Sequence, residues 1–132
     1  MSFKLEILTP AKVFFDDDAD GLMINSTNGP LTVLTGHAPM VAPLEIGDIK
    51  IKQNDAWRDA FCSEGFLEVT RDKVSVFAQA AEWAEDIDLV RADEARQRAV
   101  EKLLSKESAA EHKINEMALA RAMARIRIAK KL

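Results

Sequence analysis

Glycine and proline are confined to the first half of the chain, and this distribution limits the available folds more than any other feature. All five glycines and all four prolines lie at or before Gly65, in a chain of 132 residues. Both residues interrupt helices and favour turns, so the first half suits short strands joined by turns. The second half contains neither residue, and its apolar spacing lengthens to that of a helix within the segment Ala81–Ala99.

Short segments of alternating apolar and polar residues fill the first half. We expect strands near residues 4–9, 13–15, 21–24, 31–34, 49–52, 57–62, 66–69 and 74–77. Strands this short and this regularly spaced indicate a sandwich or a flattened barrel. The acidic run Asp16–Gly21 is expected to be a solvated turn, since its spacing does not match a calcium-binding EF-hand loop.

Two helices are expected in the second half. The first begins after Asp86 or Asp88, either of which can cap it, and carries an apolar stripe of Ala92, Ala95, Ala99 and Leu103. The second has a capping-box pattern at Ser108 and extends to about Lys130. No residue of the link 105–107 forbids a helix, so a hairpin and one continuous helix are both available.

Arginines lie within the apolar side of the second helix. A helical wheel places Ile114, Met117, Ala118, Ala122 and Ile128 on one side, with Arg121 and Arg125 in its middle. These guanidinium groups either reach the rim of a hairpin or pair with acids of the first helix. The alternative is that they bind an anion, because four arginines along one seam, with Arg91 and Arg98 of the first helix, suit a phosphate.

Charge and composition exclude several function classes. The net charge is −4, and the first 70 residues hold eleven acids against five bases, which argues against nucleic-acid binding. From Lys113 onward six bases face one acid, Glu116, so this end suits an acidic partner, a phosphate-bearing ligand or solvent. The single cysteine, Cys62, indicates a reducing compartment, and neither a secretion signal nor an apolar run of membrane-spanning length is evident.

Catalytic chemistry has little support in the residues. A phosphate-binding glycine loop is missing, because the segment Gly29–Gly36 is not followed by Lys-Ser/Thr. The two histidines, His37 and His112, form no zinc-binding spacing with Cys62. Cys62 is expected to be a buried structural thiol, and His37 a turn or interface residue.

Five segments in order resemble the epsilon subunit family of bacterial F-type ATP synthase. They are Leu8–Pro10, Val13–Asp16, Gly36–Met40, Gly65–Val69 and the segment from Ala81 to Ala92. The resemblance covers essentially the whole chain and implies an α+β fold. An N-terminal β-sandwich of about ten strands (residues 1–84) is then followed by an antiparallel two-helix hairpin (residues 85–132).

The resemblance also implies a function and partners. A member of this family is non-catalytic, has no obligatory cofactor and couples the rotor to the catalytic head during proton-driven or sodium-driven ATP synthesis. Its hairpin inhibits ATP hydrolysis when extended toward the catalytic alpha and beta subunits and permits rotation when folded down. The expected position is peripheral, on the cytoplasmic face of the membrane, without membrane insertion. The gamma subunit would contact Gly36, His37, Ala38 and Pro39, and the membrane rotor ring would contact Thr27, Asn28, Gly29, Pro30 and Leu31.

Some relatives bind ATP at the hairpin, which holds it down, and their motif is matched here. The matching residues are Glu82, Ile87, Asp88, Arg91, Ala92, Arg98, Arg121 and Arg125. In that arrangement Glu82, Ile87 and Asp88 hold the adenine end, Arg91 lies near the base and ribose, and the other arginines meet phosphates. The alternative from another class is a free-standing nucleotide-binding adaptor module; a small enzyme is a remote third.

Overall fold

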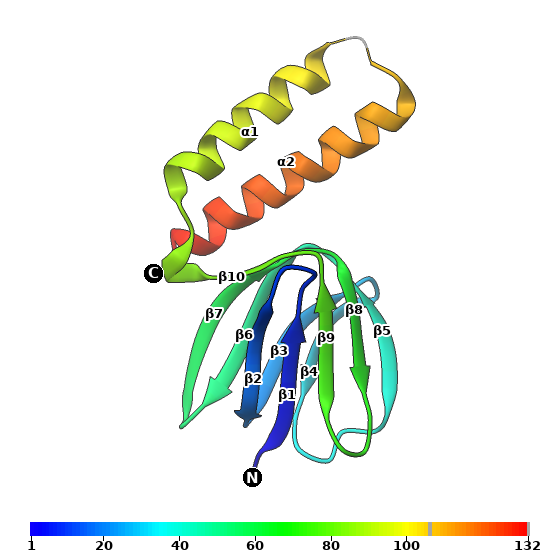
Figure 1. Ribbon diagram of the computed structural model, residues 1–132, viewed down its shortest axis with the longest axis vertical. Helices are drawn as coiled ribbons and strands as arrows, with labels where there is room; N and C mark the ends of the chain where they lie inside the picture. Colours follow the sequence, from blue (N-terminus) through cyan, green and yellow to red (C-terminus); the bar gives the residue numbers. More distant parts are fainter. Residues whose placement is uncertain (106, 132) are drawn as a thin grey trace. The chain divides into compact units, whose positions relative to one another are not determined.

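The chain forms two compact units, shown in a computed structural model that describes residues 1–105 and 107–131. The first unit is Met1–Trp83 and the second begins at Ala84. The first is made of strands, and the second of a short 3₁₀ helix and two α-helices (Figure 1). The prediction of an α+β fold with a β-sandwich and a helical hairpin is confirmed.

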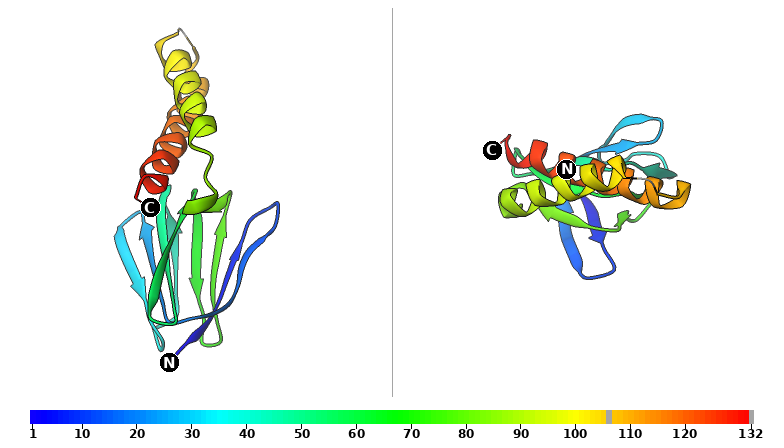
Figure 2. Two further views of the ribbon diagram at one scale, coloured as in Figure 1. Left: turned by 90° about the vertical axis from the view of Figure 1, so that its left-hand side faces the viewer. Right: turned by 90° about the horizontal axis from the view of Figure 1, so that it is seen from above.

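Ten strands build the first unit. In chain order they are β1 (Phe3–Leu8), β2 (Val13–Ala19), β3 (Gly21–Ser26), β4 (Gly29–Val33), β5 (Met40–Leu44), β6 (Gly47–Gln53), β7 (Ala56–Cys62), β8 (Gly65–Val69), β9 (Val74–Ala78) and β10 (Ala81–Trp83). They pair in the order β10-β7-β6-β3-β5-β8-β9-β1-β2, with β4 added beside β3. The sheet folds over itself into two layers, as Figure 2 shows in side view. Nearly all pairs are antiparallel, and β1 runs parallel to β9.

The two ends of this sheet, β2 and β10, meet through aromatic side chains. The ring centroids of Phe14 and Trp83 lie 4.7 Å apart, and those of Phe15 and Trp83 lie 6.2 Å apart. Farther along β2, the Gln53 side-chain amide of β6 donates to the Asp18 carbonyl oxygen at 2.8 Å. The strand order alone would leave an open seam, and these contacts bring its two edges together.

Alternating residues of the strands supply the core. In β6, Ile49 and Ile51 are fully buried while the intervening lysines reach toward the surface. The same pattern places Leu5 and Ile7 of β1 in the core beside residues such as Leu67. Period-two burial is what a sandwich with one solvated face per layer requires.

The expected turn at Asp16–Gly21 is wrong. Strand β2 continues through the acidic run to Ala19, and the chain bends at Asp20 before β3 begins at Gly21. β2 pairs with β1, from Leu8↔Val13 to Phe3↔Ala19, and forms one end of the strand order, so its aspartates face solvent. Acidic side chains at a sheet edge also discourage pairing with another chain.

The alternation in the sequence does not reveal β5. Its sequence Met-Val-Ala-Pro-Leu carries Pro43 inside the strand, which argues against a strand on sequence grounds. Pro43 nevertheless pairs with Phe66 of β8, and its carbonyl oxygen accepts from the Thr27 amide at 3.1 Å. Since proline lacks the N–H but keeps the carbonyl, it is tolerated where only the acceptor is needed.

The second unit comprises η1 (Ala84–Asp86), α1 (Leu89–Leu104) and α2 (Ala109–Ala129). The helices are antiparallel and in contact along their length (Figure 2). Of the two arrangements that the sequence allows, the hairpin is therefore the one observed; of the link 105–107, Lys106 lies outside the described residues. None of the helices in the described part of the chain has the length and apolar character needed to cross a bilayer.

Alanines form the interior of the hairpin. The buried residues of α1 are Ala92 and Ala99, and those of α2 are Ala122, Ala124 and Ile128. The expected side of α2 is wrong at one residue, because Ile114 is 64% exposed. Ile114 lies five residues into α2, in the second turn of this helix, and its side chain faces solvent.

Candidate functional site

The Ile-Asp-x-x-Arg-Ala motif builds the start of α1. Asp88 is the N-cap, and its carboxylate accepts the backbone N–H of Arg91 at 3.1 Å. Ile87 lies just before the cap and Ala92 four positions after it, and both are buried, at 9% and 5% exposure. Buried apolar residues at N′ and N4 around an N-cap are the pattern of a hydrophobic staple combined with a cap, which stabilises the start of α1. The motif thus has a structural role at positions N′, N-cap, N3 and N4 whatever else it does.

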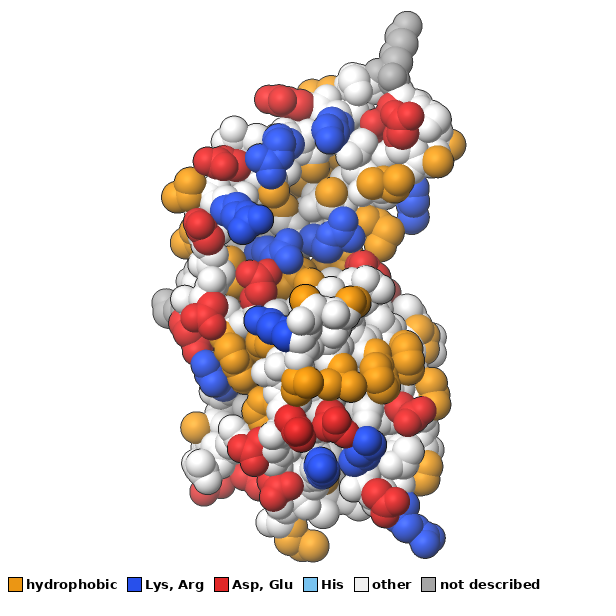
Figure 3. Space-filling model, viewed as in Figure 1, with side chains coloured by type: hydrophobic (Ala, Val, Ile, Leu, Met, Phe, Trp, Pro, Cys, Tyr) orange, Lys and Arg blue, Asp and Glu red, His pale blue; other side chains and the backbone are white. Residues whose placement is uncertain are grey.

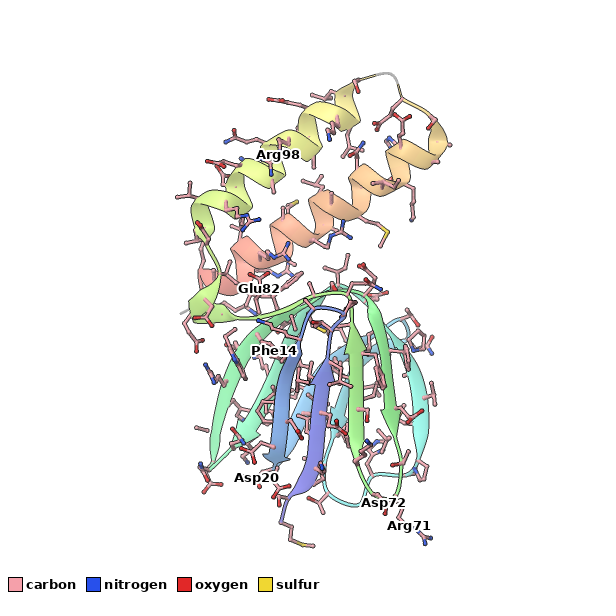
Figure 4. All side chains as sticks on the ribbon, in the orientation of Figure 1. Phe14, Asp20, Arg71, Asp72, Glu82 and Arg98 are labelled. Atoms are coloured by element: carbon pink, nitrogen blue, oxygen red, sulfur yellow. The ribbon has the colours of Figure 1, made fainter. Side chains whose placement is uncertain are left out.

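The hairpin places Arg91 and Arg121 at one level, with Arg125 about one helical turn farther from the hairpin turn. Arg91 lies thirteen residues before the end of α1, and Arg121 twelve residues after the start of α2. At 1.5 Å per residue both are about 20 Å from the turn, and Arg125 is about one helical turn farther, level with Asp88. Arg98 lies about two turns nearer to the hairpin turn, in the middle of α1 (Figure 4).

Charge on the hairpin is unevenly neutralised. Arg96 pairs with Asp93 at 2.9 Å, and the Gln97 amide donates to the same carboxylate. The side chains of Arg91 and Arg98, by contrast, are exposed and make no hydrogen bond or ion pair with any residue that the structure describes. Lys and Arg side chains gather on the face of the hairpin seen in Figure 3. Guanidinium groups presented together suit the oxygens of a phosphate chain.

Glu82 belongs to the other unit. It lies in β10, where it pairs with Phe61 of β7, next to Trp83 at the end of the strand unit. The other seven expected ATP-site residues all belong to the hairpin unit: Ile87, Asp88, Arg91, Ala92, Arg98, Arg121 and Arg125.

The segment expected to meet the rotor ring is a tight turn between β3 and β4. The Ser26 hydroxyl donates to the Gly29 carbonyl oxygen at 2.7 Å and accepts from the Asn28 amide at 3.2 Å. Gly29 has φ 118°, a conformation that other residues rarely adopt. Gly29, Pro30 and Leu31 pair with β3 as the start of β4, and Thr27, Asn28 and Pro30 are exposed.

The segment expected to meet the gamma subunit follows the other end of β4. Gly36 has φ 82°, the His37 amide donates to the Leu34 carbonyl oxygen, and His37 Nδ1 lies 2.9 Å from the Ala38 carbonyl oxygen. This loop and the β8–β9 turn line a hollow of about 60 Å³. Arg71 and Asp72 of that turn, and Asp20, lie at the same end of the strand unit in Figure 4. The two expected contact segments are thus separated by the length of β4, about 16 Å.

Comparison with protein families places both units in one family. Residues 2–84 match the family described as "ATP synthase, Delta/Epsilon chain, beta-sandwich domain". Residues 85–130 match "ATP synthase, Delta/Epsilon chain, long alpha-helix domain".

Curated relatives match along most of the chain. The ATP synthase epsilon chain of Caldanaerobacter subterraneus subsp. tengcongensis is 42% identical over 131 residues, covering 98% of this chain and 95% of the relative. That of Anoxybacillus flavithermus is 43% identical over 106 residues, covering 80% of this chain and 79% of the relative.

Solved structures share the fold at low sequence identity. A chain of the mitochondrial ATP synthase of Euglena gracilis matches with a TM-score of 0.80 and 21% identity, covering 93% of this chain and 78% of that one. A chain of the central stalk and c-ring of the Tetrahymena thermophila enzyme matches with a TM-score of 0.70 and 13% identity, covering 98% and 97%.

Proposed function

Since this chain belongs to the delta/epsilon chain family of ATP synthase, we propose that its helical hairpin regulates ATP hydrolysis by changing between two conformations. The chain is a central-stalk epsilon subunit and is non-catalytic. In the proposal, an extended hairpin blocks hydrolysis, and ATP bound to the folded hairpin favours the state that permits rotation. The subunit then serves proton-driven or sodium-driven ATP synthesis without carrying out chemistry itself.

The observation that carries the proposal is the small interior of a separate helical unit. Helix α1 is described over its whole length, and its buried residues are all alanines. Helix α2 adds two buried alanines and Ile128. A buried methyl group contributes only about 0.8 kcal/mol, so contacts between the helices stabilise the hairpin weakly. An element held this weakly can change conformation when a ligand or a partner binds one state better.

ATP binding is supported by the arginines and the helix start. Arg91 and Arg121 share one level of the hairpin and Arg125 lies about one turn farther, all near the level of the N-terminus of α1, whose dipole favours an anion. Ile87 and Asp88, together with Glu82, would hold the adenine end of ATP. Arg98 would add a further positive charge near the phosphates. ATP at 100 times its dissociation constant would stabilise the binding state by about 2.7 kcal/mol.

The partners follow from the two ends of the strand unit and from the basic helix. We assign the gamma subunit to the loop Gly36–Pro39 and the rotor ring to the turn Thr27–Leu31, since these segments lie at opposite ends of β4. The basic excess after Lys113 suits an acidic surface of the catalytic alpha and beta subunits. In this assembly the chain is peripheral, at the cytoplasmic face of the membrane.

Reconstitution tests the regulatory proposal. The host ATP synthase is purified without this subunit, the full chain is added back, and ATP hydrolysis is measured at low and high ATP. The proposal predicts inhibition at low ATP that is relieved as ATP rises. In Arg125→Ala, relief requires at least tenfold more ATP, whereas Arg127→Ala, which removes the exposed arginine two residues farther along α2, behaves as the wild type.

Two results would contradict the proposal. Hydrolysis unaffected by the added chain would remove the inhibitory function. Failure of the chain to join the complex at all would favour the alternative, a free-standing nucleotide-binding adaptor, which binds ATP but does not co-purify with a rotary ATPase.

A further inference from the structure

The turn between β3 and β4 contains an asparagine followed by a glycine, and the asparagine, Asn28, is exposed. Its backbone N–H donates to the Ser26 hydroxyl at 3.2 Å. Its side-chain amide, by contrast, makes no hydrogen bond with any residue that the structure describes. Asparagine is a chemically labile residue, and this amide can turn toward the peptide group that follows it.

Gly29 leaves that following peptide group open. Its φ is 118°, and a Cβ at this position would meet no atom of a residue beyond its chain neighbours within 4 Å. Because glycine has no side chain, nothing attached to Gly29 hinders the approach of its backbone nitrogen to Cγ of Asn28. Bond formation between these two atoms closes a five-membered ring, which forms readily.

The other asparagines of the chain are less suited to this ring closure. The side-chain amides of Asn25 and Asn115 already donate hydrogen bonds, at 3.2 Å and 2.7 Å respectively. Asn54 lies in an exposed turn, but it is followed by Asp55, whose side chain crowds the attacking nitrogen. Asn28 alone combines an exposed side chain with a following glycine.

A second pair of related chemistry, Asp20–Gly21, is closed by the fold. An aspartate before glycine can form the same ring with loss of water. Gly21 is buried in β3, however, and a Cβ there would lie 3.0 Å from the ring of Trp57. The Asp20 N–H also donates to the Lys52 carbonyl oxygen at 2.7 Å. The sequence does not separate the two pairs, whereas the structure leaves only the pair in the β3–β4 turn open.

We propose that Asn28 is a site of spontaneous deamidation in the free, folded chain. The Gly29 backbone nitrogen bonds to Cγ of Asn28, the bond from Cγ to the amide nitrogen breaks, and ammonia leaves with the proton of the Gly29 N–H. Water then opens the cyclic imide. Cleavage of the new C–N bond gives aspartate, and cleavage of the original peptide bond gives isoaspartate. Nothing is oxidised or reduced, and water is the only co-reactant.

Either product changes the turn. Aspartate adds a negative charge, and isoaspartate routes the backbone through Cβ, which lengthens the chain between Ser26 and Gly29. These two residues are partners in the β3–β4 pairing, and the Ser26 hydroxyl donates to the Gly29 carbonyl oxygen at 2.7 Å. We expect isoaspartate to disturb both interactions. The inference does not depend on the proposed function; if the turn contacts the rotor ring, chains modified before assembly present an altered contact.

Incubation of the folded full chain at mildly alkaline pH, followed by peptide mass spectrometry at intervals, tests the proposal. Deamidation replaces an amide by a carboxyl group, and fragmentation assigns the resulting mass gain to one residue. We expect the gain at Asn28 to appear about tenfold faster than at Asn25, Asn54 or Asn115, because only Asn28 precedes glycine. The modified peptide should separate into two forms of equal mass, one with aspartate and one with isoaspartate.

Two variants provide the control. Asn28→Gln should remove the gain from this turn, since the longer side chain has to close a larger ring. Asn54→Gln, which changes the other exposed turn asparagine, should leave the rate at Asn28 unchanged. Equal rates at all asparagines of the wild type would overturn the proposal. So would a gain at Asn28 that appears only when the chain is unfolded in urea, because the folded turn would then protect this residue.

Discussion

The guanidinium carbon of Arg58 lies 3.5 Å from the centre of the Trp83 ring. Trp83 is the last residue of the strand unit, and its ring also contacts Phe14 and Phe15 of the opposite edge strand. A cation over one face of the ring and aromatic side chains around it hold β10 at the seam of the sheet. The last residue of the strand unit is thereby held in the sheet by contacts within that unit.

Removing this cation should weaken the strand unit. Arg58→Ala loses the contact with Trp83, and we expect the free energy of unfolding to fall by about 1 kcal/mol. Denaturant unfolding followed by tryptophan fluorescence measures the change, in a Trp57→Phe background that leaves Trp83 as the single tryptophan. Arg71→Ala, which removes an exposed arginine of the β8–β9 turn, is the matched control and should have little effect. Equal losses in the two variants would show that the Trp83 contact adds nothing.

Gly65 should not tolerate even one added methyl group. A Cβ at this position would lie 1.8 Å from the carbonyl oxygen of Phe77, on the backbone of the neighbouring strand β9. Because backbone cannot move aside without breaking the sheet, Gly65→Ala should cost more than about 3 kcal/mol or prevent folding. Gly36→Ala is the control, since nothing lies within 4 Å of its Cβ and only its φ of 82° is unfavourable, at about 1 kcal/mol. Circular dichroism melting curves compare the two, and similar melting temperatures would contradict the expectation.

An ion pair between β1 and the β8–β9 turn should make stability depend on pH in the acidic range. The Lys73 ammonium donates to Oε1 of Glu6 at 2.7 Å, and this hydrogen bond holds the pKa of Glu6 below its ordinary value of 4.5. A carboxylate with a lowered pKa stabilises the fold above the unfolded value, and this contribution is lost as the pH falls through the folded value. The difference in melting temperature between the wild type and Glu6→Gln should therefore shrink below about pH 4.5.

The control for this pair is Glu101→Gln, an exposed glutamate of α1. Its difference from the wild type should not follow the same acid dependence. A Glu6→Gln difference that stays constant from pH 6 to pH 2.5 would show that the Glu6 carboxylate is not stabilised by Lys73.

Cys62 should be unreactive in the folded protein. Burial, with a smaller contribution from the charge of Glu64, raises the pKa of its thiol to about 12. The thiolate that reacts with disulfide reagents is therefore scarce at neutral pH. Labelling with a chromogenic disulfide should take hours under native conditions and seconds in denaturant. Rapid labelling of the native chain would show that β7 opens readily at this position.

The sequence predicts the architecture of the chain better than the extent of its elements. The caps of the two helices follow directly from residue chemistry, since Asp88 and Ser108 each accept the N–H three residues onward. Strand β2 is longer than predicted because aspartates are poor strand formers in general but are tolerated at a solvated edge. Strand β5 was not predicted because it contains Pro43, which is unusual inside a strand. The proline is tolerated there because its neighbour uses only its carbonyl oxygen, so the missing N–H costs nothing.

Some features of the candidate site could likewise be predicted from the sequence, and others could not. That Arg91 of α1 and Arg121 of α2 share one level follows from the residue spacing once a turn between the helices is assumed. The pairing of Arg96 with Asp93, and the staple of Ile87 with Ala92, could have been read from i, i+3 and cap rules but were not predicted. The contact of His112 with Glu107 depends on how the residues before α2 fold, and spacing alone does not determine this.

Calorimetric titration of ATP, and then of ADP, into the full chain tests the proposed ATP-sensitive hairpin most directly. We expect one site per chain with a preference for ATP, an affinity at least tenfold weaker in Arg125→Ala, and an unchanged affinity in Arg127→Ala. Trp83 fluorescence, followed in parallel, should change with the same midpoint because this residue adjoins Glu82. No binding at millimolar ATP, or equal affinity in the wild type and Arg125→Ala, would contradict the account.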